Sequence, residues 1–207
     1  MPEARSTRDA LLDAAYDAAV AGDWARTRML DVALNAGVSR QTLYNEFGSK
    51  DALAQALAMR EIGRFIEGTE RALDEAHPDD PIQAVGAAAL YTLQQAADNP
   101  LLKAALIDDT SGLLAFLTTR GEPAIAAART SFETYYSTHW PHLSRDAIRT
   151  AAEAITRLTV SYLVLPADVP AEVIATRLAD LARTLLSARA EHDPSARAEH
   201  DPSRGMT

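Results

Sequence analysis

Apolar residues in the first quarter of the chain recur at helical spacing and are interrupted by glycine. Met29, Val32, Ala33 and Ala36 follow the i, i+3, i+4, i+7 pattern that gives a helix one apolar face. Gly37 is predicted to end this helix, because glycine tolerates the left-handed conformation that closes many helices. The pattern therefore predicts a helix followed by a sharp turn.

A short second helix is predicted directly after this turn. Ser39 is placed to cap it, because its hydroxyl can accept a backbone N–H two or three residues further on, and Val38 and Leu43 occupy the two positions of a hydrophobic staple. Leu43 and Phe47 face inward, and Gly48 ends the helix. Its outer side chains are rich in hydrogen-bond donors, which suit DNA bases and phosphates. These are Arg40, Gln41, Thr42, Tyr44 and Asn45. The pattern predicts a helix-turn-helix unit.

A helix-turn-helix presents the first residues of its second helix to base edges. Arg40 and Gln41 are the best candidates for base contacts, because Arg matches guanine and Gln matches adenine in a bidentate manner. Thr27 and Lys50 lie at the starts of two helices, where backbone N–H groups favour phosphate. The predicted DNA-binding residues are Thr27, Arg28, Ser39, Arg40, Gln41, Thr42, Tyr44, Asn45 and Lys50.

The segment AGVSRQTLYNEFGSKDAL, residues 36–53, resembles the signature of the TetR family of transcriptional regulators, and the resemblance extends over residues 5–58. It implies a homodimeric regulator, expected to be a repressor, with a near-palindromic double-stranded operator and an unknown small-molecule effector. Ala19 stands where the family usually has a bulky aromatic residue. We expect Trp24 to fill that space, because a missing core aromatic would cost about 3–5 kcal/mol.

The whole chain is expected to be all-α, with an N-terminal three-helix helix-turn-helix domain and a C-terminal helical ligand-binding and dimerisation domain. We place the first domain at residues 1–50, the second at 51–187 and a tail at 188–207. One long helix from Ser49 to about Ala76 is predicted to connect the two domains. Further helices are predicted at 82–97, 100–107 and 124–140, then one ending near Pro166 and one following Pro170.

The last two helices are the candidates for the dimer interface. Their apolar stripes have the spacing of helices that pack along other helices. The predicted interface residues are Ile148, Ile155, Tyr162, Ile174, Leu178, Leu181 and Leu185. Packing of these stripes inside one chain fits the pattern equally well.

The resemblance also implies a ligand pocket in the second domain. Its candidate residues are large or polar-tipped side chains, which in a mainly apolar cavity would suit a hydrophobic or aromatic small molecule. These residues are Tyr91, Leu106, Phe116, Phe132, Tyr135, Tyr136, His139 and Tyr162. Each of them could instead serve only to pack the core.

Composition changes this picture in two ways. The chain has no cysteine, so it has no disulfide framework and no thiolate metal site, and no long apolar run or signal-like start is present. We therefore expect a cytoplasmic protein without membrane contact. A net charge of −9 disfavours DNA binding, but Arg26, Arg28, Arg40 and Lys50 outnumber two acidic residues within 24–50.

An enzyme is the competing class of protein. His139 and His142 have a spacing that could ligate zinc, but Pro141 breaks the helix that would align them. Phosphate-cradling and nucleophile motifs are absent from the sequence, so we expect no enzyme activity, no cofactor and no metal. A third possibility is an all-helical small-molecule-binding protein with weak or no DNA binding, acting through a protein partner.

The tail carries an eight-residue duplication, ARAEHDPS at 188–195 and again at 196–203. Its charged, proline-containing composition predicts disorder. His192 and His200 could hold a metal weakly.

Overall fold

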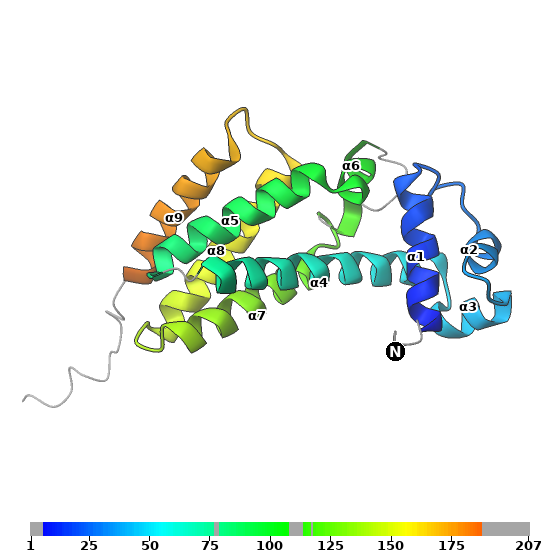
Figure 1. Ribbon diagram of the computed structural model, residues 1–207, viewed down its shortest axis with the longest axis horizontal. Coiled ribbons are helices and arrows are strands. Elements are labelled where there is room, and N and C mark those ends of the chain that lie inside the picture. Colours follow the sequence, from blue (N-terminus) through cyan, green and yellow to red (C-terminus); the bar gives the residue numbers. More distant parts are fainter. Residues whose placement is uncertain (1–5, 77–78, 108–113, 117, 188–207) are drawn as a thin grey trace, which may run out of the picture.

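The computed structural model describes residues 6–76, 79–107, 114–116 and 118–187, and over these ranges the chain is helical without strands. The duplicated tail lies outside the described residues. Three short helices form a head at one end of the molecule (Figure 1). They are α1 (Thr7–Val20), α2 (Met29–Asn35) and α3 (Arg40–Phe47). The predicted helix-turn-helix is confirmed.

Local capping explains where these helices begin and end. Ser39 precedes α3, and its hydroxyl accepts the backbone N–H of Thr42 at 3.0 Å. Gly37 and Gly48 have φ values of +69° and +72°, a conformation that residues with a Cβ rarely adopt. The turn between α2 and α3 is therefore fixed by residues within it.

The head has its own hydrophobic core. Leu11, Val32, Leu43 and Leu53 are at most 2% exposed and bring α1, α2, α3 and the start of the next helix together. Trp24 is 3% exposed and belongs to the same core as the small Ala19. The burial of Trp24 in this core supports the expectation that it compensates for the missing aromatic, which stays a prediction.

Helix α4 (Lys50–Ala76) runs from the head into the second part of the molecule, where it packs on α5 and α7 (Figure 1). The prediction of one long connecting helix is confirmed. The remaining elements are α5 (Pro81–Asp98), α6 (Pro100–Ile107), the 3-10 turn η1 (Leu114–Phe116), α7 (Glu122–His139), α8 (Arg145–Val164) and α9 (Ala171–Ser187). Within the described ranges, no helix is long and apolar enough to cross a membrane.

The second part is a helical bundle in which α5 packs along α9 and α4, and α8 packs between α7 and α9. The core of this bundle contains the apolar residues of α8 and α9 that were predicted to form a dimer interface. Ile148, Ile155, Ile174 and Leu178 are 2–5% exposed in a single chain. Tyr162, Leu181 and Leu185 are partly buried against the same core. All seven residues therefore pack within one chain, and the buried ones are unavailable to a second chain.

Candidate DNA-binding and ligand sites

The outer face of α3 carries most of the predicted DNA-binding residues. Arg40, Gln41 and Asn45 are exposed, and Tyr44 keeps 39% of its surface exposed. Leu43 and Phe47 on the opposite face are buried in the head core. The helix therefore holds its polar face outward through two anchoring side chains.

Two arginine side chains at α3 pack against aromatic rings. The Arg40 guanidinium lies 5.1 Å from the centroid of the Tyr44 ring. Arg8 lies 4.8 Å from the Phe47 ring and forms an ion pair of 2.7 Å with Glu46. Because Arg8 offsets the charge of Glu46, the exposed face of α3 is left with the positive charge of Arg40.

Other residues that were predicted to contact DNA form local hydrogen bonds at helix ends. The Thr27 hydroxyl donates to the Asp23 carbonyl oxygen at 2.8 Å, and the Arg28 backbone N–H donates to Asp31 at 2.9 Å. Ser39 and Thr42 share a contact of 2.8 Å between their hydroxyl oxygens. The Arg28 side chain remains exposed, whereas Thr27 and Thr42 are half-buried.

Lys50 is directed into the head rather than outward. Its ammonium donates to the carbonyl oxygens of Trp24 and Ala25, the latter at 3.2 Å. Burial lowers the pKa of Lys50, because desolvation penalises the charged form. The residue that the sequence assigned to phosphate contact thus ties the start of α4 to the preceding loop.

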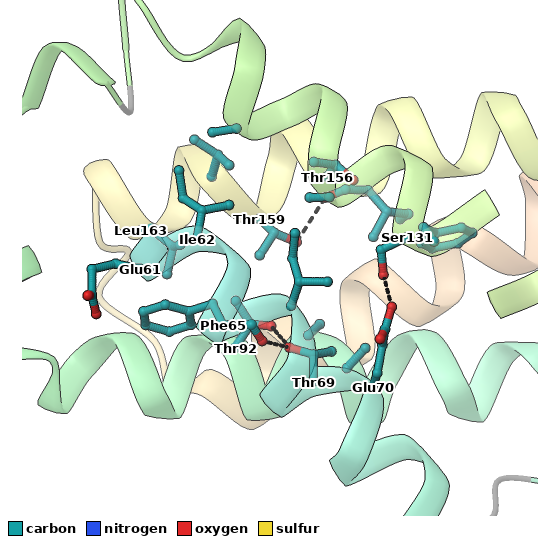
Figure 2. Close-up of a pocket in the computed structure, with 18 of the residues that line it drawn as sticks. Glu61, Ile62, Phe65, Thr69, Glu70, Thr92, Ser131, Thr156, Thr159 and Leu163 are labelled. Atoms are coloured by element: carbon teal, nitrogen blue, oxygen red, sulfur yellow. Dashed lines mark hydrogen bonds between the residues drawn. The ribbon is translucent and has the colours of Figure 1, made fainter. Parts of the chain in front are cut away.

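A cavity of about 250 Å³ lies in the second part of the molecule and is lined by residues of α4 to α8 and η1 (Figure 2). Four of the predicted pocket residues line it, namely Phe116, Phe132, Tyr135 and Tyr136. The other four predicted residues are absent from its lining, and these are Tyr91, Leu106, His139 and Tyr162.

Side-chain direction explains two of these differences. Tyr91 packs so closely on Gly68 that a Cβ there would lie 2.4 Å from the tyrosine hydroxyl. His139 is exposed, and its ring stacks on Tyr135 at 4.0 Å between centroids. Within the described parts of the chain, no group of three or more potential metal-binding side chains occurs.

Sequence reasoning missed the contribution of α4 to the cavity wall. One stripe of this helix faces the cavity, with members at intervals of three and four residues. They are Ala58, Glu61, Ile62, Phe65, Ile66, Thr69, Glu70 and Leu73. The sequence did contain a signal for this wall. A helix that only links two domains does not need a long apolar face, and polar Thr69 and Glu70 interrupt such a face on α4.

Two tyrosine hydroxyls near the cavity are uncharged. The Tyr136 hydroxyl donates to the Pro81 carbonyl oxygen at 2.7 Å, and burial is the main cause that raises its pKa. The pKa of Tyr135 is also raised, by burial and by the nearby charges of Asp74 and Glu70. Both phenols therefore stay neutral at physiological pH.

The cavity and the head share part of their packing. Leu101, Ala105 and Phe116 line the cavity and also belong to the hydrophobic core of the head. The half-buried Arg60 at the start of this region binds Asp13 of α1 at 2.8 Å. A change in the shape of the cavity can therefore reach the head through direct contacts.

Known regulatory proteins resemble this chain over both of its parts. A family model described as bacterial regulatory proteins, tetR family, matches residues 11–57. A second model, described as bacterial tetracyclin repressor, C-terminal domain, matches residues 80–184. The HTH-type transcriptional regulator AlkX of Mycobacterium tuberculosis is 32% identical over 186 residues, which cover 89% of this chain and 86% of that protein.

Solved structures of TetR-family regulators also resemble this chain. The crystal structure of the TetR family repressor AlkX from Dietzia sp. strain DQ12-45-1b, implicated in biodegradation of n-alkanes, has a TM-score of 0.72 and 30% identity. The match covers 88% of this chain and 97% of that one. A TetR-family regulator from Pectobacterium atrosepticum shares the fold, with a TM-score of 0.60, 18% identity, and coverage of 87% and 92%.

Proposed function

The chain belongs to the TetR family of DNA-binding transcriptional regulators, and from this premise we propose that it is a homodimeric repressor controlled by a small molecule. The small molecule binds in the cavity beside α4 and changes the affinity of the head for its operator. The observation that carries the proposal is the set of side chains shared by the cavity wall and the head core, Leu101, Ala105 and Phe116.

Sequence reading is assigned to the first turn of α3. Arg40 and Gln41 are exposed there, and they are the residue types that pair with guanine and adenine in the major groove. Tyr44 and Asn45 follow on the same helix, where they can reach a base or a phosphate. Arg28 at the start of α2 is exposed and suits a phosphate contact.

Dimerisation is assigned to the outer faces of α8 and α9, since their inner faces are used within one chain. Leu158 of α8 and Val173 of α9 are each 38% exposed, and Leu165, directly after α8, is 73% exposed. Large apolar side chains that remain exposed at such positions are suited to a second copy of the chain. Two heads related by a two-fold axis would read a near-palindromic operator.

Ligand control requires that the ligand binds one head arrangement more tightly than another. Filling the cavity would displace α6 and η1, which pack on the head, or α4, which enters it. The mainly apolar lining supports an apolar effector. The implication of the Dietzia relative in n-alkane biodegradation is in keeping with such a molecule.

Selection of DNA from a random pool by the purified chain, at two salt concentrations, tests the first half of the proposal. We expect a palindromic consensus whose binding weakens as salt rises, because phosphate contacts release counterions. Arg40→Ala and Gln41→Ala should each weaken binding by about tenfold to a hundredfold, since one good bidentate contact is worth about 1–3 kcal/mol.

Arg71→Ala is the matched control, because Arg71 is an exposed arginine of α4 beyond the head. It should leave the consensus and affinity unchanged. Full DNA binding by the Arg40→Ala/Gln41→Ala double variant would contradict the assignment. Absence of any consensus would favour the alternative of a small-molecule-binding protein that acts through a protein partner.

A further inference from the structure

The cavity beside α4 has an uneven distribution of charge. Two carboxylates, Glu61 and Glu70, line it, whereas its described lining contains no lysine, arginine or histidine (Figure 2). The part of this apolar space next to Glu70 disfavours an anionic occupant, because like charges repel strongly where water is scarce.

The two carboxylates have different surroundings. Glu61 forms ion pairs with Arg60 at 3.0 Å and Arg64 at 2.9 Å, so its charge is balanced. Glu70 is half-buried, and across the described residues it forms no ion pair. One of its oxygens accepts a hydrogen bond from the Ser131 hydroxyl at 2.5 Å. The Glu70 carboxylate can therefore accept a further hydrogen bond from a ligand.

Two of the threonine hydroxyls in the cavity lining already donate their protons to backbone carbonyl oxygens. Thr69 donates to the Phe65 carbonyl oxygen and Thr159 donates to the Ile155 carbonyl oxygen, each at 2.8 Å. Each hydroxyl has only one proton but two lone pairs. The Thr69 and Thr159 hydroxyls can therefore act toward a ligand only as hydrogen-bond acceptors, as the Glu70 carboxylate does, and acceptors call for a donor on the ligand.

The shape of the lining indicates a chain-like molecule. On α4 the wall extends from Ala58 to Leu73, which at 1.5 Å per residue is about 22 Å. A volume of about 250 Å³ spread over such a length leaves a narrow space. Apolar side chains such as Ile62, Phe65 and Leu163 line most of it.

We propose that the effector is a chain-like aliphatic molecule whose head is not anionic and donates a hydrogen bond to Glu70. A hydroxyl or an ammonium group meets this requirement, whereas a carboxylate does not. This inference rests on the proposed control by a small molecule and names the chemical class of that molecule.

Titration calorimetry of the full-length protein with dodecanol, dodecylamine and dodecanoate, each below its aggregation limit, tests the inference. We expect dodecanol or dodecylamine to bind at least tenfold more tightly than dodecanoate, and the order of the first two identifies the preferred head. Equal or tighter binding of dodecanoate would overturn the inference, as would failure of all three probes to bind.

Substitution of the carboxylate gives a second readout. Glu70→Gln should weaken the donor ligand severalfold and strengthen dodecanoate, so that the preference narrows or reverses. Glu67→Gln is the control, since Glu67 is exposed on the same helix and does not line the cavity. An unchanged preference in folded Glu70→Gln would overturn the role of this residue. Should the Glu70→Gln variant fail to fold, Ser131→Ala gives another test. It is expected to strengthen binding of the donor ligand, because it frees the Glu70 oxygen that accepts the Ser131 hydrogen bond. An unchanged affinity would count against the role of Glu70.

Failure of this inference is distinguishable from failure of the proposed function. If dodecanoate binds best and also changes DNA affinity, control by a small molecule stands and only the assigned chemical class is wrong. If a donor ligand binds but DNA affinity does not change, the chemical class stands and the proposed control fails.

Discussion

The ammonium of Lys50 lies 5.1 Å from the centroid of the Trp24 ring and donates a hydrogen bond to the backbone carbonyl oxygen of the same residue. The first residue of α4 is thereby tied to the loop that precedes α2. This contact holds the entry of the long helix against the head core.

Lys50→Met is expected to lower the free energy of unfolding by about 1–3 kcal/mol, because hydrogen bonds from a charged donor are lost and two carbonyl groups lose a partner. Urea unfolding followed by circular dichroism measures this change. Lys103→Met is the control, because Lys103 is exposed on α6 and its ion pair with Asp98 is long at 3.9 Å. Unchanged stability together with weaker, less salt-dependent DNA binding would instead identify Lys50 as a phosphate contact.

Trp24→Ala is expected to destabilise the protein by about 3–5 kcal/mol, because it removes a large buried aromatic from a core that contains only alanine at position 19. Trp24→Phe should cost less, since most of the buried volume is kept. Thermal unfolding of both variants measures the difference. Equal stability of the two variants would contradict the role of Trp24 as the filler of this space.

The head could be predicted from sequence because its conformation is set by neighbouring residues. Gly37, Ser39 and Gly48 determine the turn and the ends of α3 through backbone conformation and capping, which depend on only a few positions. The exposed face of α3 then follows from the burial of Leu43 and Phe47.

The cavity and the outer surfaces depend on how helices are rotated against one another, which periodicity leaves open. Tyr91 and Phe132 are both aromatic residues on helices, yet only Phe132 points into the cavity, while Tyr91 packs against Gly68. Likewise, the repeat of Ile148 and Ile155 predicts an apolar partner helix but does not tell whether it lies in the same chain.

Gly68→Ala is expected to destabilise the protein by about 1–3 kcal/mol, because the added Cβ would lie 2.4 Å from the Tyr91 hydroxyl and force the ring to move. Gly63→Ala is the matched control on the same helix, where a Cβ meets nothing within 4 Å. It should stabilise by about 0.5–1 kcal/mol through helix propensity. Urea unfolding of both variants measures the contrast, and a similar change in both would show that Tyr91 does not restrict position 68.

The buried hydroxyl of Tyr136 makes stability depend on alkaline pH. Its pKa is raised above the ordinary value of 10.0, so the folded state keeps a proton that the unfolded state loses. The stability linked to this phenol is fully present below about pH 10 and is lost as pH rises toward the folded pKa. Stability should therefore fall from about pH 10 to about pH 11 and above, by at most about 1.4 kcal/mol per pH unit for this one group.

Tyr136→Phe is expected to cost about 1 kcal/mol at neutral pH, since the hydrogen bond to the Pro81 carbonyl oxygen is lost, and to flatten the alkaline dependence. Tyr135→Phe should flatten it less, because Tyr135 is less deeply buried although its pKa is also raised. Urea unfolding of the three proteins across this pH range separates the two phenols. If Tyr136→Phe kept the full slope of the unaltered chain, the alkaline loss would have to arise from another group, and the burial of this hydroxyl would not be its cause.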